Sequence, residues 1–100
     1  MLQVADANLF LAPPRIVADT RVEFRSAVLE SLDRANETGA HLFSIDMTET
    51  RHVDASGLGI LVLVQKRARE RGLTTRLLNT QHDVRTLLAH TKLESLFEFA

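Results

Sequence analysis

Apolar and polar positions change along the chain in blocks that predict helices separated by short strands. Between Thr20 and Gly39, apolar residues recur at offsets of 3, 4, 8 and 11 positions, which places them on one face of an amphipathic helix. They are Phe24, Ala27, Val28, Leu32 and Ala35. Thr20 and Glu23 have the spacing of a capping box, and Gly39 stands where a helix C-terminal glycine is expected. We therefore expect this helix to begin at Thr20 and to end before Gly39.

A second helix is predicted to begin within residues 54–59. The cations in residues 65–71 suit the negative end of a helix dipole, and Gly72 can terminate the helix. Residues 60–64 alone, all β-branched or leucine, are equally compatible with a buried strand. The basic tail and Gly72 favour the helix.

Short apolar blocks around these helices predict strands. The blocks are residues 8–11, 41–47, 75–79 and 96–99. Pro13 and Pro14 follow the first block and cannot occupy a central strand, and residues 48–53 form a polar connection. Asn79 or Thr80 can cap a third helix, whose apolar face holds Val84, Leu87 and Leu88. Strands that alternate with helices require crossover connections and predict a largely parallel sheet.

Composition and charge narrow the possible functions. The chain has 100 residues, the size of one compact domain, so we expect residues 1–100 to form a single domain. Its 12 basic and 13 acidic residues give a net charge of −1, which argues against a nucleic-acid or anionic-membrane partner. The absence of cysteine excludes disulfides and thiolate metal sites and fits a cytoplasmic protein. Neither a secretory signal in residues 1–6 nor an apolar run of the roughly 20 residues that span a bilayer is expected.

The start of the second helix breaks a local rule. Gly57 and Gly59 both lie in its first turns, although each glycine inside a helix costs up to about 1 kcal/mol relative to alanine. Such local inconsistencies are often functional, and glycine also lets another backbone come close. Ser56 follows a strand and begins a helix, so it lies on the rim of the sheet where binding sites form. A phosphate on Ser56 would be tolerated by the free helix amides, whereas a plain helix N-cap is the alternative role for this serine.

These residues carry a resemblance to a known family. Ile45-Asp46-Met47-Thr48, a short spacer, and then Val53-Asp54-Ala55-Ser56-Gly57-Leu58-Gly59-Ile60-Leu61 resemble the signature of STAS domains, and in particular of bacterial anti-sigma factor antagonists. The resemblance implies a single α/β domain with a mixed, mostly parallel sheet of four to five strands and three helices. The family's usual terminal helix is not expected, because the sequence ends after the last predicted strand.

The resemblance also implies a function. In this family a serine at the position of Ser56 is phosphorylated by a partner that is both a serine kinase and an anti-sigma factor, and a serine phosphatase resets the switch. Asp54 would lie beside the acceptor hydroxyl. The expected partner surface comprises Asp54, Gly57, Leu58, Gly59, Asp46, Thr48 and Asp19. Many members carry an aspartate where this chain has Val17, with Asp19 nearby but out of register, which puts the kinase contact in question. The domain itself would be no enzyme and would need no cofactor.

Several alternatives stay open. The motif could form a constitutive interface in a stress-signalling assembly or in a lipid-transport ATPase complex, and the chain could be a monomer or a weak dimer. Leu58 could be an exposed contact or a core residue, and Asp46 could support chemistry or cap a turn. A nucleotide-binding loop is disfavoured because the third glycine of the fingerprint is replaced by Val62. Metal binding is disfavoured because no two histidines are three or four residues apart on one helix, and His82 and His90 are two turns apart.

Overall fold

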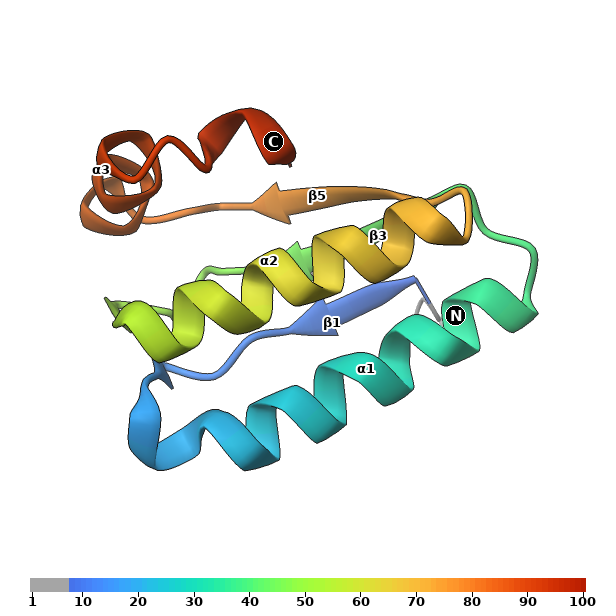
Figure 1. Ribbon diagram of the computed structural model, residues 1–100, viewed down its shortest axis with the longest axis horizontal. Helices are drawn as coiled ribbons and strands as arrows, with labels where there is room; N and C mark the ends of the chain where they lie inside the picture. Colours follow the sequence, from blue (N-terminus) through green and yellow to red (C-terminus); the bar gives the residue numbers. More distant parts are fainter. Residues whose placement is uncertain (1–7) are drawn as a thin grey trace, which may run out of the picture.

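Four parallel strands form the sheet of the computed structural model, which describes residues 8–100. In spatial order they are β1 (Leu9–Leu11), β3 (Leu42–Asp46), β5 (Thr74–Leu78) and β6 (Glu98–Phe99). A separate parallel ribbon pairs β2 (Arg15–Ile16) with β4 (His52–Val53). The helices within residues 8–100 are α1 (Arg21–Glu37), α2 (Ala55–Glu70) and α3 (His82–His90), and the 3-10 turns are η1 (Ala18–Thr20) and η2 (Glu94–Leu96) (Figure 1).

This architecture confirms the predicted α/β fold with three helices and a mostly parallel sheet. Every strand pairing within residues 8–100 is parallel. The apolar blocks at 8–11, 41–47 and 75–79 form β1, β3 and β5, and the ambiguous residues 60–64 lie inside α2. The last block was only partly right, because it divides into η2 and the short β6. The prediction that 48–53 is only a connection was wrong at its end, where β4 forms.

The core lies between the sheet and the helix layer, with α1 and α2 side by side over one sheet face (Figure 1). Strand residues facing this layer are buried, including Phe43, Ile45 and Leu77, while the Phe10 ring lies 5.9 Å from that of Phe24 on α1. The predicted apolar face of α1 is buried except for Ala27, which is exposed. Because side chains alternate along a strand, Leu9 and Leu11 point to the opposite face and stay 41% and 55% exposed.

Both predicted glycine ends of helices are confirmed. Gly39 follows α1 with φ +75° and Gly72 follows α2 with φ +79°, a left-handed conformation that glycine adopts without a Cβ penalty. In each case the next residue donates its amide back into the helix, from Ala40 to Ala35 at 3.2 Å and from Leu73 to Ala68 at 2.8 Å. These bonds satisfy carbonyl groups that the helix end would otherwise leave unpaired.

Thr20 is the residue before α1, as predicted, but it gives no side-chain cap, and the predicted cap of α3 was wrong. Thr20 precedes α1, but its φ of −109° and ψ of 3° are not the extended geometry of a capping residue, and its hydroxyl instead bonds Val17 and Arg15 in the preceding turn. The residue before α3 is Gln81, which is extended and gives no side-chain cap. Asn79 adopts φ +56° and turns its amide toward another strand end, while the Thr80 hydroxyl is buried without a hydrogen-bond partner within residues 8–100.

The β2–β4 ribbon leads directly into the start of α2. Ile16 is fully buried in the ribbon, and its carbonyl accepts the Asp54 amide at 3.3 Å. This hydrogen bond ties the residue before α2 to the ribbon, so the ribbon helps to position the start of α2. No helix within residues 8–100 is both long and apolar enough to cross a bilayer.

Candidate functional site

The carboxylate of Asp54 joins two elements at the start of α2. One oxygen, Oδ1, accepts the Gly57 amide at 3.0 Å, which makes Asp54 the N-cap of the helix. The other oxygen, Oδ2, accepts the Ala18 amide of η1 at 3.0 Å, from 36 residues away in the chain. The alternative that Ser56 is a plain N-cap was therefore wrong, because the capping role belongs to Asp54.

Hydrogen bonds lower the pKa of Asp54. The largest cause is the Gly57 amide and the second is the Ala18 amide, both of which favour the ionised carboxylate. Asp54 is consequently an anion at neutral pH, close to the expected phosphate acceptor. A group whose pKa is lower in the folded chain than in the unfolded chain stabilises the fold above its unfolded value and loses that contribution as the pH falls through its folded value.

We expect Asp54→Asn to flatten the acid side of the stability profile. Asparagine caps helices as well as aspartate, so the fold should persist, but it cannot titrate. Thermal unfolding measured from pH 7 downward should show a smaller loss below about pH 4, the ordinary aspartate range, than in the wild type. Glu49→Gln, at an exposed loop position without an ion pair within residues 8–100, is the matched control. Identical acid slopes for Asp54→Asn and the wild type would contradict this prediction.

The two glycines of the motif have different surroundings. A Cβ on Gly57 would lie 2.1 Å from the Ile16 carbonyl oxygen, so only glycine permits the ribbon to pack against α2. A Cβ on Gly59 would meet nothing within 4 Å, and Gly59 is exposed. Leu58 is only 8% exposed, which settles its open assignment in favour of the core. Gly57 and Leu58, which were expected on a partner surface, are thus buried, whereas Gly59 is exposed.

Ser56 lies in the first turn of α2, between the capping carboxylate and the exposed glycine. It is half-buried, and its backbone amide contributes to the lowered pKa of Asp54. Its hydroxyl has no hydrogen-bond partner within residues 8–100, so no structural bond would have to break before the oxygen reacts. The arrangement can present a hydroxyl at the positive end of a helix, where the helix dipole favours an added anion.

Asp46 and Thr48 belong to a neighbouring polar network. Asp46 Oδ1 accepts both the amide of Thr48, at 2.9 Å, and its hydroxyl, at 2.5 Å, so Asp46 caps a turn, as one of its two assignments proposed. The Thr48 hydroxyl is the largest cause of the lowered pKa of Asp46. Asn79 donates to the Thr48 hydroxyl at 3.1 Å, and Gln81 donates to the Thr48 carbonyl at 2.6 Å. The network links the ends of β3 and β5, and its hydrogen bonds do not run to Asp54 or Ser56.

The sequence did not lead us to predict Asn79 and Gln81 as members of this polar network. A signal existed for Asn79, because an asparagine directly after a strand often adopts a left-handed conformation and turns its amide to a neighbouring loop. Asp19 is exposed in η1, next to the Ala18 amide that Asp54 binds, so the structure brings it to the start of α2. Val17 lines a groove together with Asp54.

Comparisons with known proteins agree with this fold. The family model described as STAS domain matches residues 16–100. A candidate anti-sigma factor antagonist from Thermotoga maritima aligns with a TM-score of 0.74 at 17% identity, covering 97% of this chain and 81% of that one. A sulfate transporter family protein from Wolinella succinogenes aligns with a TM-score of 0.70 at 19% identity, covering 97% and 80%.

A third solved structure is the anti-sigma factor antagonist SpoIIAA in its unphosphorylated form. It aligns with a TM-score of 0.64 at 12% identity, covering 100% of this chain and 86% of that one. No curated protein sequence matches the chain. At these identities the structural likenesses establish the shared fold.

Proposed function

The chain belongs to the STAS domain family, and from this premise we propose that it is an anti-sigma factor antagonist switched by phosphorylation of Ser56. Its partner would be a serine kinase that also acts as the anti-sigma factor, and a serine phosphatase would reset the switch in the cytoplasm. The unphosphorylated chain would hold the kinase and free the sigma factor. The kinase would bring the nucleotide, and the chain would contribute the acceptor and no catalytic step of its own.

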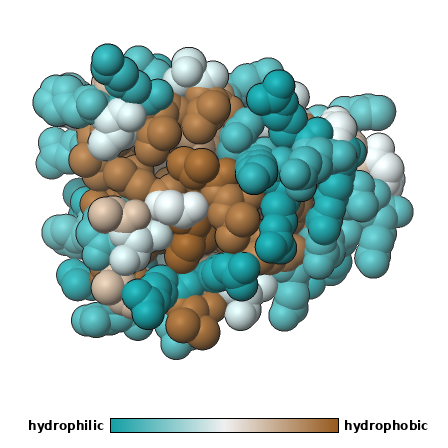
Figure 2. Space-filling view, in the orientation of Figure 1, coloured by the Kyte–Doolittle hydropathy of each residue, from teal (hydrophilic) through white to brown (hydrophobic). Residues whose placement is uncertain are grey.

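The observation that carries the proposal is the open space around Gly59. Within residues 8–100 nothing explains a glycine there, because its φ is not left-handed and no neighbour would meet a Cβ. A helical glycine without internal cause is explained if a partner's backbone approaches α2 one turn beyond Ser56. Figure 2 supports a contact here, since apolar surface covers the first half of α2 and polar surface covers its second half. Val62 and Leu63, at the middle of α2 and one turn beyond Gly59, are half-buried, and exposed apolar patches mark protein contacts.

The switch follows from charge at the same place. A phosphate on Ser56 would add about −1.5 to −2 charges at neutral pH, beside the ionised carboxylate of Asp54. The helix start tolerates the anion in the free chain, so the fold should survive phosphorylation. A docked partner would instead face two adjacent anions in the contact, and the complex should weaken.

A second candidate is a constitutive interaction module. The fold is shared with a sulfate transporter family protein as well as with anti-sigma factor antagonists, so the fold alone does not require a switch. Only the switched antagonist requires phosphorylation of Ser56. Both candidates require a partner contact at Gly59.

The first test is intact-mass analysis of the protein after incubation with ATP and its candidate serine-kinase partner. We expect one added phosphoryl group on the wild type and none on Ser56→Ala, because Ser56 is the acceptor. Ser26→Ala is the control, since Ser26 is an exposed hydroxyl on α1, outside the expected partner surface, and its loss should leave the phosphate in place. A stable complex without added phosphate would exclude the switch and favour the constitutive module.

A further inference from the structure

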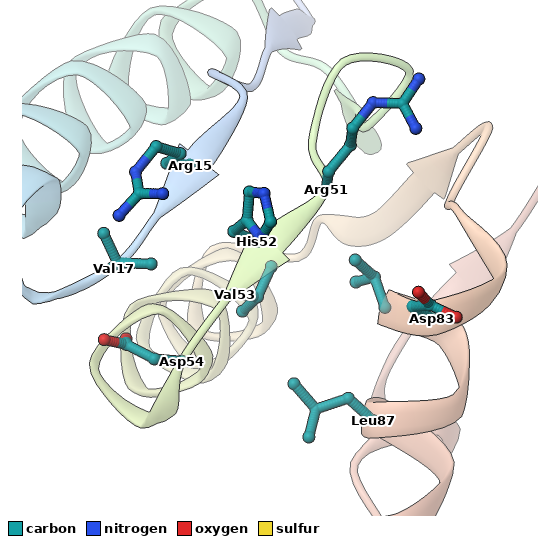
Figure 3. A pocket seen from close by; sticks show the side chains of 9 residues that line it. Arg15, Val17, Arg51, His52, Val53, Asp54, Asp83 and Leu87 are labelled. Carbon is teal, nitrogen blue, oxygen red and sulfur yellow. The ribbon is translucent and has the colours of Figure 1, made fainter.

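An open groove of about 460 Å³ lies between the β2–β4 ribbon and α3, beside the start of α2 (Figure 3). Its apolar part comes from both walls: Val53 stands on β4, and Val84 and Leu87 stand on α3. In Figure 3 the Leu87 side chain points from α3 toward the β4 side. Val84 is 2% exposed and forms the buried floor of the groove. Leu87 is half-buried, so part of its side chain is accessible to a ligand.

Two arginines border this groove without an ion pair inside residues 8–100. Arg15 and Arg51 are both exposed, and they lie on either side of His52 in Figure 3. Of the other arginines, Arg34, Arg71, Arg76 and Arg85 form ion pairs, whereas Arg21, Arg25, Arg67 and Arg69 also have none within residues 8–100. Arg15 stands directly opposite His52 in the ribbon register, so both side chains lie on the same face of the ribbon.

The groove also contains two carboxylates, which remain charged but lie at the starts of helices and form no ion pair with Arg15 or Arg51. Asp54 accepts the amides of Gly57 and Ala18. Asp83 lies in the first turn of α3, where the positive end of the helix favours an anion. Within the described chain the guanidinium groups of Arg15 and Arg51 have no ion-pair partner, so the groove offers two unpaired cations beside its apolar part.

We propose that this groove binds a segment of the partner kinase in which an apolar side chain is flanked by Asp or Glu. This inference rests on the proposed function and names the chemistry of the docking segment. The apolar side chain would lie between Val53 and Leu87, and the carboxylates would pair with Arg15 and Arg51. Charge complementarity argues for this occupant, and the position argues for the kinase, because the groove shares Asp54 with the start of α2. Docking here would hold the kinase while Ser56 is within its reach.

The test measures kcat/KM for phosphorylation of Ser56 in charge-reversed variants at low and high salt. Arg15→Glu and Arg51→Glu should each lower kcat/KM at least tenfold, mainly through KM, and the loss should shrink as salt screens the contact. Leu87→Gln should lower kcat/KM to a similar degree without the salt dependence. Arg69→Glu is the matched control, since it makes the same charge change on the exposed far end of α2. Thermal unfolding of each variant checks that the fold is kept.

The possible results separate the inference from the proposed function. Normal phosphorylation of Arg15→Glu, Arg51→Glu and Leu87→Gln would overturn the docking groove and leave the switch intact. Absence of phosphate on the wild type would contradict both the docking groove and the proposed switch at Ser56. If ATP alone, without the kinase, shifts the NMR signals of His52 and Val53, the groove belongs to a nucleotide and the kinase-segment assignment is wrong.

Discussion

Gly57→Ala should lower the free energy of unfolding by about 1–3 kcal/mol, the usual range for an overpacked position. The added Cβ would lie 2.1 Å from the Ile16 carbonyl oxygen and 2.8 Å from Ile16 Cγ2. The first of these atoms is backbone and cannot move aside by rotating a side chain. Since Ile16 is fully buried and its carbonyl accepts the Asp54 amide, relieving the clash must shift either the ribbon or the start of α2. Alanine's better helix propensity, up to about 1 kcal/mol, offsets only part of this cost.

Urea unfolding of the two glycine variants is the sharpest measurement. Gly59→Ala adds the same methyl group two residues along the same helix, where nothing lies within 4 Å. It should therefore raise the free energy of unfolding by up to about 1 kcal/mol, which is opposite in sign to Gly57→Ala. For a chain of this size, each kcal/mol corresponds to roughly 4–8 °C in the unfolding temperature. Equal shifts of the same sign would show that the close approach of Ile16 to Gly57 is wrong.

The elements that sequence could predict are those governed by local periodicity. The apolar repeat of α1, the bulky run of β3 and the two glycine helix ends depend on residues close together in the chain, and the structure confirms them. The wrong caps show where local reasoning fails. Thr20 has the residue type of a cap, but it is the last residue of η1, and its hydroxyl bonds Val17 and Arg15 instead. The neighbouring sequence alone does not show which of two competing hydrogen-bond arrangements is the more stable.

The candidate site shows a second limit. The motif from Asp54 to Gly59 is visible in the sequence, yet its two glycines look alike there. Their difference depends on Ile16, more than 40 residues upstream, whose ribbon partner could not be assigned from two-residue strands. The bond from Ala18 to Asp54 and those from Asn79 and Gln81 to Thr48 also join distant segments. Such long-range contacts place the site, and only the assembled fold defines them.

Gly59→Gln should weaken binding of the partner kinase without lowering the stability of the free chain. Glutamine is a good helix former, so the free chain should be at least as stable as the wild type. If a partner's backbone packs against α2 at this position, the new side chain would occupy that space, and the affinity for the kinase should fall about 100-fold, or roughly 2.7 kcal/mol. Calorimetric titration with the kinase, beside urea unfolding of the free variant, measures both quantities.

The matched control for this variant is Lys66→Gln, because residue 66 lies two helical turns further along the same face of α2 and is exposed. Loss of affinity in Gly59→Gln alone would limit the contact to the first half of α2, beside Ser56, as the apolar surface of that half indicates (Figure 2). Equal losses in both variants would extend the interface along the whole helix. Unchanged affinity in Gly59→Gln would contradict the argument that a partner explains this glycine, and with it the observation on which the proposed function depends.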